Sequence, residues 1–207
     1  MNTERNVEIK VMAKGKVYYD QPRDCIDWFR EQYEFLSNFY PAKLVFDGIA
    51  YDNAESAYQA QKLVNAADRH QFEHRYADEA KHMGQKVEVR PDWDEVKLGL
   101  MEKIVYAKFT QNPHLAELLV KTEDIPIFEG NHWGDTYWGI SLKTREGENH
   151  LGKILMELRT KFKTEGIPEG DSCHSVRCFG PVDGIIITDE DITLLEVDCI
   201  VRYFQMI

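Results

Sequence analysis

The sequence contains no long hydrophobic run. No stretch of about 18 apolar residues, the length of a transmembrane helix, occurs in its 207 residues, and its first 16 residues hold no apolar signal-peptide core. Its four cysteines are too few for a disulfide framework in a chain of this length, so reduced thiols are expected. We therefore expect a cytoplasmic protein that has no membrane partner.

Sequence motifs of nucleotide and metal sites are also missing. No Gly-Lys-Ser/Thr follows Gly130-x-x-x-Gly134, and no Rossmann fingerprint appears. His70 and His74 have the i,i+4 spacing of metal ligands, but without an adjacent carboxylate motif they are better explained as two solvated side chains. Cys173, His174 and Cys178 lack the paired cysteines of a zinc site. We expect neither a metal nor a cofactor.

Positive charge is scarce. Lys and Arg number 25 against 36 Asp and Glu, which gives a formal net charge of −11. This balance argues against broad affinity for phosphate backbones, although it leaves room for a local basic pocket that holds a diphosphate. Aromatic residues are plentiful, with ten Phe, ten Tyr and four Trp, and 43% of the residues are hydrophobic. The chain can therefore bury a core, as one domain with extensions.

The patterning predicts an α+β fold that is mainly α-helical. Residues 43–51 form a predicted β-hairpin with Asp47-Gly48 at its turn, and residues 7–19 alternate like a strand or hairpin. Helices are predicted over 54–66, over 92–111, from Pro113 onward and over 149–164. The segment 122–148 has no helical periodicity and is rich in Gly, Asp and aromatic residues, which is typical of a functional loop.

Three regions follow from this pattern. We predict an N-terminal β-type extension over 1–27, a helical body over 28–165 and a C-terminal β-type appendage over 166–207. The appendage begins with a turn-rich linker and then has two β-type runs, which we expect to pack on the body and to pair with the N-terminal strand.

Glu55 allows two interpretations. Asp52-Asn53-Ala54-Glu55 fits a capping box, in which Asp52 is the N-cap and Glu55 returns to its backbone N–H. In the other interpretation, Glu55 faces a cleft and orients water or stabilises a sugar cation. The N-terminus of a helix favours the ionised form of a carboxyl group, which would suit a base.

The cluster Trp133-Gly134-Asp135-Thr136-Tyr137-Trp138-Gly139 holds a second carboxylate among aromatic rings. Asp in a Gly-rich loop is most often a turn former, and any single Trp is most often part of a core. However, Trp133 and Trp138 lie where no core periodicity exists, so stacking on a ligand ring is plausible there. Paired carboxylates such as Glu55 and Asp135 are a familiar route to the hydrolysis of glycosidic bonds.

Taken in order, many short motifs resemble the NADAR family (NAD- and ADP-ribose-associated, also called YbiA-like). The matching segments are Phe35-Leu36-Ser37-Asn38-Phe39, Asp47-Gly48, Glu55, Tyr58-Gln59-Ala60-Gln61-Lys62, Ala80-Lys81 with Gly84, Arg90-Pro91-Asp92-Trp93, Val96-Lys97, Met101, Lys108-Phe109, Leu118-Leu119 with Thr122, Trp133-Gly134-Asp135, Tyr137-Trp138-Gly139 and Asn149-x-Leu151-Gly152-x-x-Leu155-Met156-x-x-Arg159. Three positions depart from the family pattern: Ser56 stands where His is frequent, Gln85 where a basic residue is common, and residues 140–143 lack the usual glycine-rich run.

The resemblance implies a mostly helical, YbiA-like catalytic domain over 28–165 with a small antiparallel β element. It also implies an N-glycosidase that cleaves a bond between ribose and a nitrogen base. Family members act on phosphorylated intermediates of riboflavin biosynthesis, or on ADP-ribose attached to guanine in nucleic acid, where they reverse a toxin's modification. Carried over by position, the expected active-site residues are Glu55, Trp93, Trp133 and Asp135.

We expect Glu55 to stabilise the sugar cation and to align water, while Asp135 positions the ribose hydroxyls or shares the proton traffic. Trp93 and Trp133 would be the walls of the site. The expected substrate contacts also include Asn38, Lys62, Trp138, Arg90 and Lys97. The favoured substrate is ADP-ribosylated guanine, in nucleic acid or as a nucleotide. The alternatives are a glycosidase of the riboflavin pathway and a non-catalytic module that binds ADP-ribose or NAD.

Overall fold

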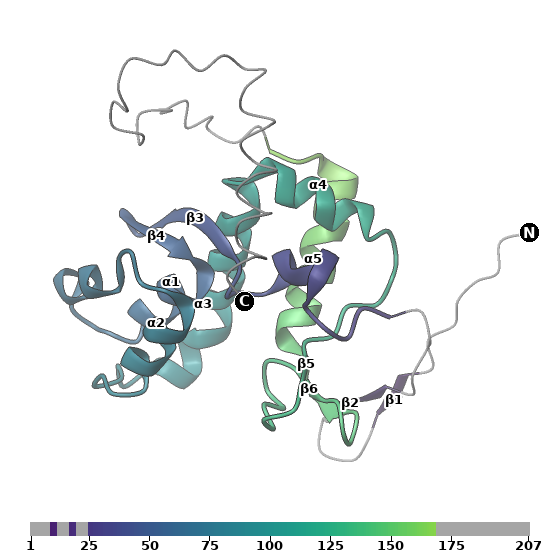
Figure 1. Cartoon of the computed structure of the whole chain (residues 1–207), viewed down its shortest axis with the longest axis horizontal. Helices are drawn as coiled ribbons and strands as arrows, with labels where there is room; N and C mark the ends of the chain where they lie inside the picture. Colours follow the sequence, from purple (N-terminus) through teal and green to yellow (C-terminus); the bar gives the residue numbers. More distant parts are fainter. Residues whose placement is uncertain (1–8, 12–16, 20–24, 169–207) are drawn as a thin grey trace, which may run out of the picture. The chain divides into compact units, whose positions relative to one another are not determined.

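The computed structural model describes residues 9–11, 17–19 and 25–168 (Figure 1). Contacts divide the chain into two units, Met1–Ser172 and Cys173–Ile207, and the fold described below is that of the first. The predicted C-terminal appendage lies outside the described residues from position 169 onward.

The fold is α+β and mainly helical, which confirms the predicted class. Its α-helices are α1 (Ala54–Ala60), α2 (Ala77–Gly84), α3 (Trp93–Thr110), α4 (Pro113–Lys121) and α5 (His150–Glu165). The described residues also form the 3-10 helices η1 (Glu31–Leu36), which precedes β3, and η2 (Ala66–Phe72), which lies between α1 and α2. The strands are β1 (Ile9–Val11), β2 (Val17–Tyr19), β3 (Pro41–Phe46), β4 (Ile49–Asn53), β5 (Gly130–Asn131), β6 (Ile140–Ser141) and β7 (Glu146–Gly147).

The predicted hairpin over 43–51 is the pair β3–β4. Its turn is Asp47-Gly48, and both residues have positive φ, 50° and 77°, as a tight hairpin turn requires. Alternate residues of β3, Ala42 and Leu44, are buried. Strand β4 runs directly into α1, so the hairpin fixes where that helix begins.

Helix α3 lies at the centre of the described core. It contacts α1, β3, α4 and α5, and it buries Met101, Ile104, Val105 and Phe109 (Figure 1). Because Pro113 has no backbone N–H to donate, the chain restarts as α4 with this proline in the first turn, as predicted. Within the described residues, no helix has the combination of length and apolar character that spanning a membrane would require.

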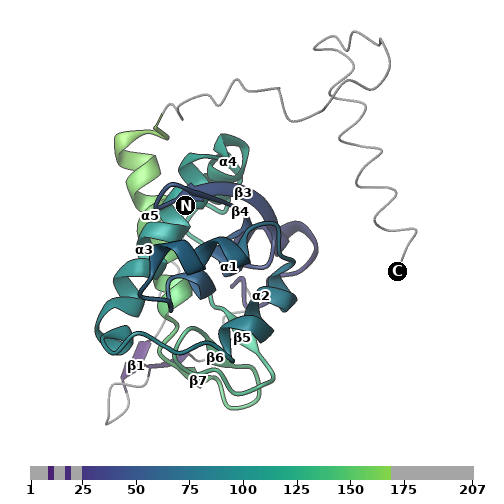
Figure 2. The ribbon, with the colours of Figure 1, turned by 90° about the vertical axis from the view of Figure 1, so that its left-hand side faces the viewer.

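The short strands β5, β6 and β7 lie together, and all three belong to the segment 122–148 that was predicted as a functional loop (Figure 2). Strands β5 and β6 pair in parallel, with Asn131 opposite Ser141. Strand β7 pairs with β2, which in turn pairs with β1. The N-terminal hairpin therefore pairs with β7, whereas its predicted partner, the C-terminal appendage, lies outside the described part of the chain.

Candidate active site

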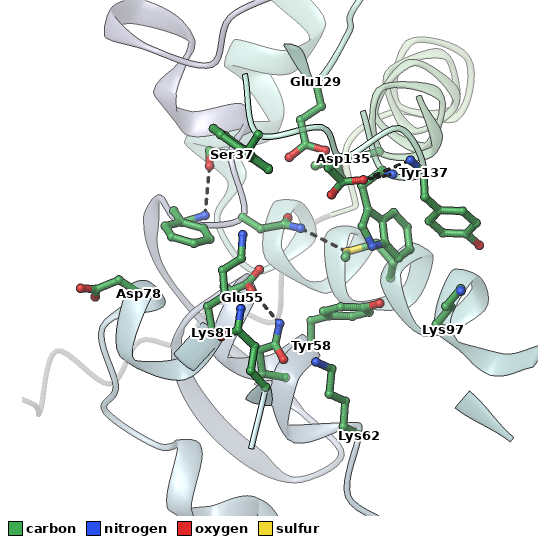
Figure 3. A pocket seen from close by; sticks show the side chains of 18 of the residues that line it. Ser37, Glu55, Tyr58, Lys62, Asp78, Lys81, Lys97, Glu129, Asp135 and Tyr137 are labelled. Carbon is green, nitrogen blue, oxygen red and sulfur yellow. Dashed lines mark hydrogen bonds between the residues drawn. The ribbon is translucent and has the colours of Figure 1, made fainter. Parts of the chain in front are cut away.

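One cavity of about 740 Å³ collects the carboxylates and aromatic rings that the sequence analysis selected (Figure 3). Its walls come from the loop after η1, from α1, from α2, from the first half of α3, from the segments on both sides of β5, and from the start of α5. The lining residues used in the following paragraphs are Asn38, Phe39, Glu55, Tyr58, Gln59, Lys62, Lys81, Trp93, Lys97, Met101, Glu129, Trp133, Asp135, Tyr137 and Trp138.

Glu55 belongs to this cavity and not to a capping box. The N-cap of α1 is Asn53, whose side chain accepts a hydrogen bond of 2.8 Å from the backbone N–H of Ser56. The prediction of Asp52 as N-cap is therefore wrong by one residue. With the helix capped by Asn53, Glu55 is free to accept a hydrogen bond of 2.8 Å from Gln59 Nε2 inside the cavity.

Burial sets the electrostatics of Glu55, which is 7% exposed. Desolvation raises the pKa of its carboxyl group, and the nearby Asp135 raises it further, while Gln59, Lys81 and Lys62 act in the opposite direction. The direction is thus opposite to that expected from the helix N-terminus alone, because the loss of water around the carboxylate outweighs the helix dipole. A carboxyl group whose pKa is raised above its ordinary value exchanges protons more readily near neutral pH than an ordinary glutamate does.

Asn131 shapes the loop that carries Asp135. This asparagine is completely buried, and its Oδ1 accepts hydrogen bonds from the backbone N–H groups of Gly134 and Asp135. Asp135 Oδ1 in turn accepts from the backbone N–H groups of Tyr137 and Trp138, at 3.1 and 3.0 Å. Asp135 is therefore a turn former and a cavity residue at the same time, so the two readings of this residue are compatible.

Two tryptophan rings pack against the ring of Tyr58 along one side of the cavity. The ring centroid of Tyr58 is 5.0 Å from that of Trp93 and 5.5 Å from that of Trp138. Trp133 differs, because it is 67% exposed at the rim. Across the rim, Lys81 Nζ lies 5.7 Å from the Trp133 ring and 5.4 Å from the ring of Phe39. At the rim, the ammonium group of Lys81 thus lies close to two exposed aromatic side chains.

The remaining predicted contacts divide into residues inside and outside the cavity. Lys62 lines it and donates a hydrogen bond to Gly84 O, and burial lowers the pKa of this lysine. Lys97 also lines it, lies 4.4 Å from the Tyr137 ring centroid and pairs with Asp94. Arg90 is not a lining residue, because its guanidinium forms a bidentate pair with Asp92 at 2.6 and 2.8 Å.

Asn38 is held in the cavity by a buried lysine. Lys108 is fully buried on α3, and its Nζ donates to the carbonyl oxygens of Phe35 and Ser37, at 2.6 and 2.7 Å. These bonds fix the loop that carries Asn38, whose Nδ2 donates to Met101 Sδ. Asn38 Oδ1 is buried and has no hydrogen-bond partner in the described structure, so it is available to a donor group on a ligand.

Four further residues of the cavity had been given no role from the sequence: Tyr58, Gln59, Lys81 and Glu129. Tyr58, Gln59 and Lys81 stood in matching motifs but had no distinguishing local signal. Glu129 lies immediately before β5, between Phe128 and Gly130, where the sequence suggested only a loop. Its contribution depends on burial, which is a property of the folded chain.

Among the residues that the structure describes, no group of three or more His, Cys, Asp or Glu side chains is arranged to hold a metal ion. His70 pairs with Glu73 and His74 pairs with Asp52, so each of these two histidines faces a different carboxylate.

Comparison with known protein families decides the assignment. The model of the NADAR domain matches residues 21–163, which is more than half of the chain. This chain belongs to the NADAR family. The NADAR domain thus covers the whole cavity, including every lining residue named above.

Known relatives of this NADAR protein include enzymes. It is 33% identical to an N-glycosidase of Nostoc punctiforme over 139 residues, which cover 64% of this chain and 88% of the relative. It is 32% identical to N-glycosidase YbiA of Escherichia coli over 138 residues, covering 65% and 85%. A riboflavin biosynthesis protein of Vibrio vulnificus is 32% identical over 145 residues, and there the match spans 64% of this chain but only 36% of the relative.

The solved structure of Escherichia coli YbiA, determined by NMR, is also similar to this NADAR protein. The two share 30% sequence identity and a TM-score of 0.61, over 73% of this chain and 92% of YbiA. The similarity in structure and that in sequence therefore concern the same domain.

Proposed function

We propose that this NADAR protein is an N-glycosidase that removes ADP-ribose from guanine, in nucleic acid or in a nucleotide. The observation that carries the proposal is the meeting of Glu55 and Asp135, from distant parts of the chain, in one cavity walled by Tyr58, Trp93 and Trp138. The names of the relatives in Nostoc and Escherichia support the reaction class, the hydrolysis of an N-glycosidic bond.

The polar groups of the cavity favour a ribose attached to phosphates. Asn38 Oδ1 and Gln59 Oε1 are buried acceptors that receive no hydrogen bond within the described structure, and ribose hydroxyl groups are donors that would satisfy them. Lys62, Lys81 and Lys97 line the same cavity and would pair with a diphosphate. The volume of about 740 Å³ falls within the ~300–1,000 Å³ range of small-molecule sites.

The aromatic side chains suit a purine. Trp133 and Phe39 are exposed at the rim, where a flat base could stack, and such stacking contributes about 1–3 kcal/mol per base. Because the chain carries a net charge of −11, we expect it to grip the ADP-ribose adduct and not a long phosphate backbone. Turnover on an oligonucleotide should accordingly depend only weakly on salt.

In the proposed reaction, the bond between the anomeric carbon and the base nitrogen breaks, and its electron pair leaves with the base. The ribose gains oxocarbenium character, which the carboxylate of Glu55 stabilises. Glu55 also aligns a water molecule, takes one of its protons and directs its oxygen to the anomeric carbon. Burial raises the pKa of Glu55, and Lys81 and Lys62 oppose that rise and favour the ionised form that this role needs. Asp135 positions the ribose hydroxyls.

A second candidate substrate class is a phosphorylated intermediate of riboflavin biosynthesis. The name of the Vibrio vulnificus relative favours it. Such an intermediate also joins a ribose derivative to nitrogen and carries phosphate, so the same carboxylates and lysines would serve. A non-catalytic module for ADP-ribose or NAD would need the aromatic wall and the lysines but no paired carboxylates, and the presence of both Glu55 and Asp135 therefore disfavours it.

The test is a time course with an oligonucleotide that carries ADP-ribose on guanine, following free ADP-ribose and restored oligonucleotide together. Glu55→Gln should reduce turnover by about 10²–10⁴-fold. Glu102→Gln is the matched control, because Glu102 is exposed on α3 and does not line the cavity. Wild-type activity only on riboflavin intermediates would redirect the substrate class, and intact bound ADP-ribose with no turnover on either would favour the binding module.

A further inference from the structure

Glu129 is a third carboxyl group in the cavity, and its main chain is firmly held. The backbone N–H of Glu129 donates a hydrogen bond of 3.0 Å to Asn149 Oδ1, and its carbonyl oxygen accepts one of 2.8 Å from the backbone N–H of Ile140. A side chain at Gly139 would collide with that carbonyl oxygen, so the two segments are packed as closely as glycine allows. With its backbone fixed in this way, Glu129 directs its side chain into the cavity (Figure 3).

One oxygen of the Glu129 carboxyl group lacks a hydrogen-bond donor in the described part of the chain. Glu129 Oε2 is buried and accepts no hydrogen bond from any residue that the structure describes. The charged groups that face it are Asp135 from the loop after β5, Glu55 from α1 and Lys81 from α2. Burial is the largest cause of the pKa shift of Glu129. Together with the two carboxylates it raises this pKa to about 8, against the smaller opposite effect of Lys81. Near neutral pH this carboxyl group therefore carries a proton.

The other two carboxyl groups are placed differently. Asp135 Oδ1 already accepts two backbone N–H groups. Burial raises the pKa of Glu55 as well, but there the hydrogen bond from Gln59 and the charges of Lys81 and Lys62 oppose the rise, whereas only Lys81 opposes it at Glu129. Among these three side chains, Glu129 alone receives no hydrogen bond at its buried oxygen. In glycosidic hydrolysis, two carboxyl groups whose surroundings push their pKa values apart divide the roles of acid and base.

We propose that Glu129 is the catalytic acid that protonates the departing base. This role rests on the proposed N-glycosidase function. The bond from the anomeric carbon to nitrogen breaks, its electron pair goes to the nitrogen, and the proton of Glu129 joins that nitrogen. Water adds its oxygen to the anomeric carbon and gives one proton to Glu55. That proton later returns to Glu129 through solvent, so one water molecule is consumed and both carboxyl groups regain their starting states.

The decisive variant is Glu129→Gln, because glutamine has nearly the shape of the protonated acid and no charge, and the fold should tolerate it. On ADP-ribosylated guanine we expect kcat to fall by about 10²-fold or more, with KM changed little. The wild-type rate should decline as the pH rises through about 8, where Glu129 loses its proton, and the variant should lack this decline. Glu157→Gln, at an exposed position of α5, is the control and should behave as the wild type.

A substrate that needs no acid separates chemistry from structure. ADP-ribose joined through its anomeric carbon to 4-nitrophenol releases a stable phenolate without a proton. On this substrate, Glu129→Gln should keep at least about a third of the wild-type kcat if Glu129 acts as the acid. Equal losses on both substrates, or no loss on the guanine adduct, would overturn the role. Failure of the wild type on both substrates would instead remove the proposed function itself, and this role with it.

A measurement without turnover gives an independent check. Carboxyl-labelled glutamate can be followed by ¹³C NMR during a pH titration of the intact protein. One resonance should titrate near pH 8 in the wild type and be missing from Glu129→Gln. Titration of Glu129 in the ordinary glutamate range would contradict the proposal, because the group would then be ionised at neutral pH and would have no proton to give.

Discussion

Gln59 Nε2 donates a hydrogen bond of 2.8 Å to Glu55 Oε1, one turn earlier on α1. Gln59 is itself held in place by α2, since a side chain at Gly84 would collide with Gln59 Oε1. The orientation of Glu55 therefore depends on the packing of two helices, even though the residue stands in the first turn of α1, where a capping role is usual.

Replacing Gln59 by methionine should change the acid limb of the pH profile. The hydrogen bond from Gln59 favours the ionised form of Glu55, so its loss should raise the pKa of Glu55 further. The rising limb of kcat should move to higher pH, and turnover at pH 7 should fall about tenfold, as expected for a lost hydrogen bond to a charged group. A pH profile of kcat for both proteins checks this, and an unshifted limb would show that Gln59 does not tune Glu55.

Lys108 should make the stability of the protein depend on pH. Burial lowers the pKa of this lysine from 10.5 to about 7 in the folded state. Between these values the unfolded chain binds a proton that the folded chain does not, so the free energy of unfolding should rise with pH across this window. Because each pKa unit corresponds to about 1.4 kcal/mol, the rise in the free energy of unfolding across this window is on the order of 5 kcal/mol; it is complete above the unfolded pKa and is lost as the pH falls toward 7.

Lys108→Met should remove this contribution, which denaturant titrations at several pH values between 7 and 10 can measure. The difference between wild type and variant cancels groups that titrate in both. Lys103→Met is the matched control, because Lys103 is exposed on the same helix. The variant should also bind substrate more weakly, since the carbonyl oxygens of Phe35 and Ser37 lose their donor and the loop of Asn38 loses its anchor. Parallel pH curves for wild type and Lys108→Met would contradict this account.

Asn131→Ala should lower both stability and activity. The side chain of Asn131 accepts two backbone N–H groups and donates to the carbonyl oxygens of Asp135 and Ile140, all in a completely buried position. Leaving such groups unsatisfied costs about 1–3 kcal/mol each, so we expect a loss of at least about 2 kcal/mol in the free energy of unfolding. Turnover should fall more than in a variant that is destabilised equally at a site far from the cavity, because the loop that positions Asp135 is no longer held by Asn131. Asn131→Asp keeps the two acceptor bonds but sets an oxygen against the carbonyl oxygens of Asp135 and Ile140, so it should lower stability as well.

Trp133 and Trp138 should behave as opposites. Trp138 packs against Tyr58, Tyr137 and His150, so Trp138→Ala should lower the free energy of unfolding by about 2–4 kcal/mol. Trp133 is 67% exposed, and Trp133→Ala should leave stability within about 0.5 kcal/mol. If Trp133 stacks on the base, its loss should raise KM for the guanine adduct by about tenfold. An unchanged KM would show that Trp133 takes no part in binding.

Local patterns predicted the regular elements well. The hairpin over 43–51 follows from Asp47-Gly48, whose backbone conformation few other pairs adopt, and the start of α4 follows from Pro113. The helix predicted over 54–66 ends earlier, at Ala60. One reason is that the carbonyl oxygen of Lys62 accepts a hydrogen bond of 2.8 Å from the backbone N–H of Arg90, a partner that lies outside the local sequence.

The candidate site was less predictable, because its chemistry depends on burial. The motifs identified Glu55, Asp135, Trp93 and Trp138, and the structure places all four side chains at one cavity. Nothing in the sequence around Glu129 distinguishes it from a solvated loop residue. Its raised pKa comes from the removal of water and from carboxylates on other elements, and neither is visible before the chain folds. Arg90 was selected for its charge, yet that charge pairs with Asp92 two residues away.

The cavity is assembled from both sides of α3 in the sequence: Asn38 and Glu55 precede this helix, while Glu129 and Asp135 follow it. A chain still being synthesised would therefore have no complete site, since the aromatic wall forms only after Trp138 has packed against Tyr58. Closing contacts between such distant segments is the slow part of folding for many domains. Recovery of turnover after dilution from denaturant would accordingly report the last long-range step, and should lag behind the return of helical circular dichroism.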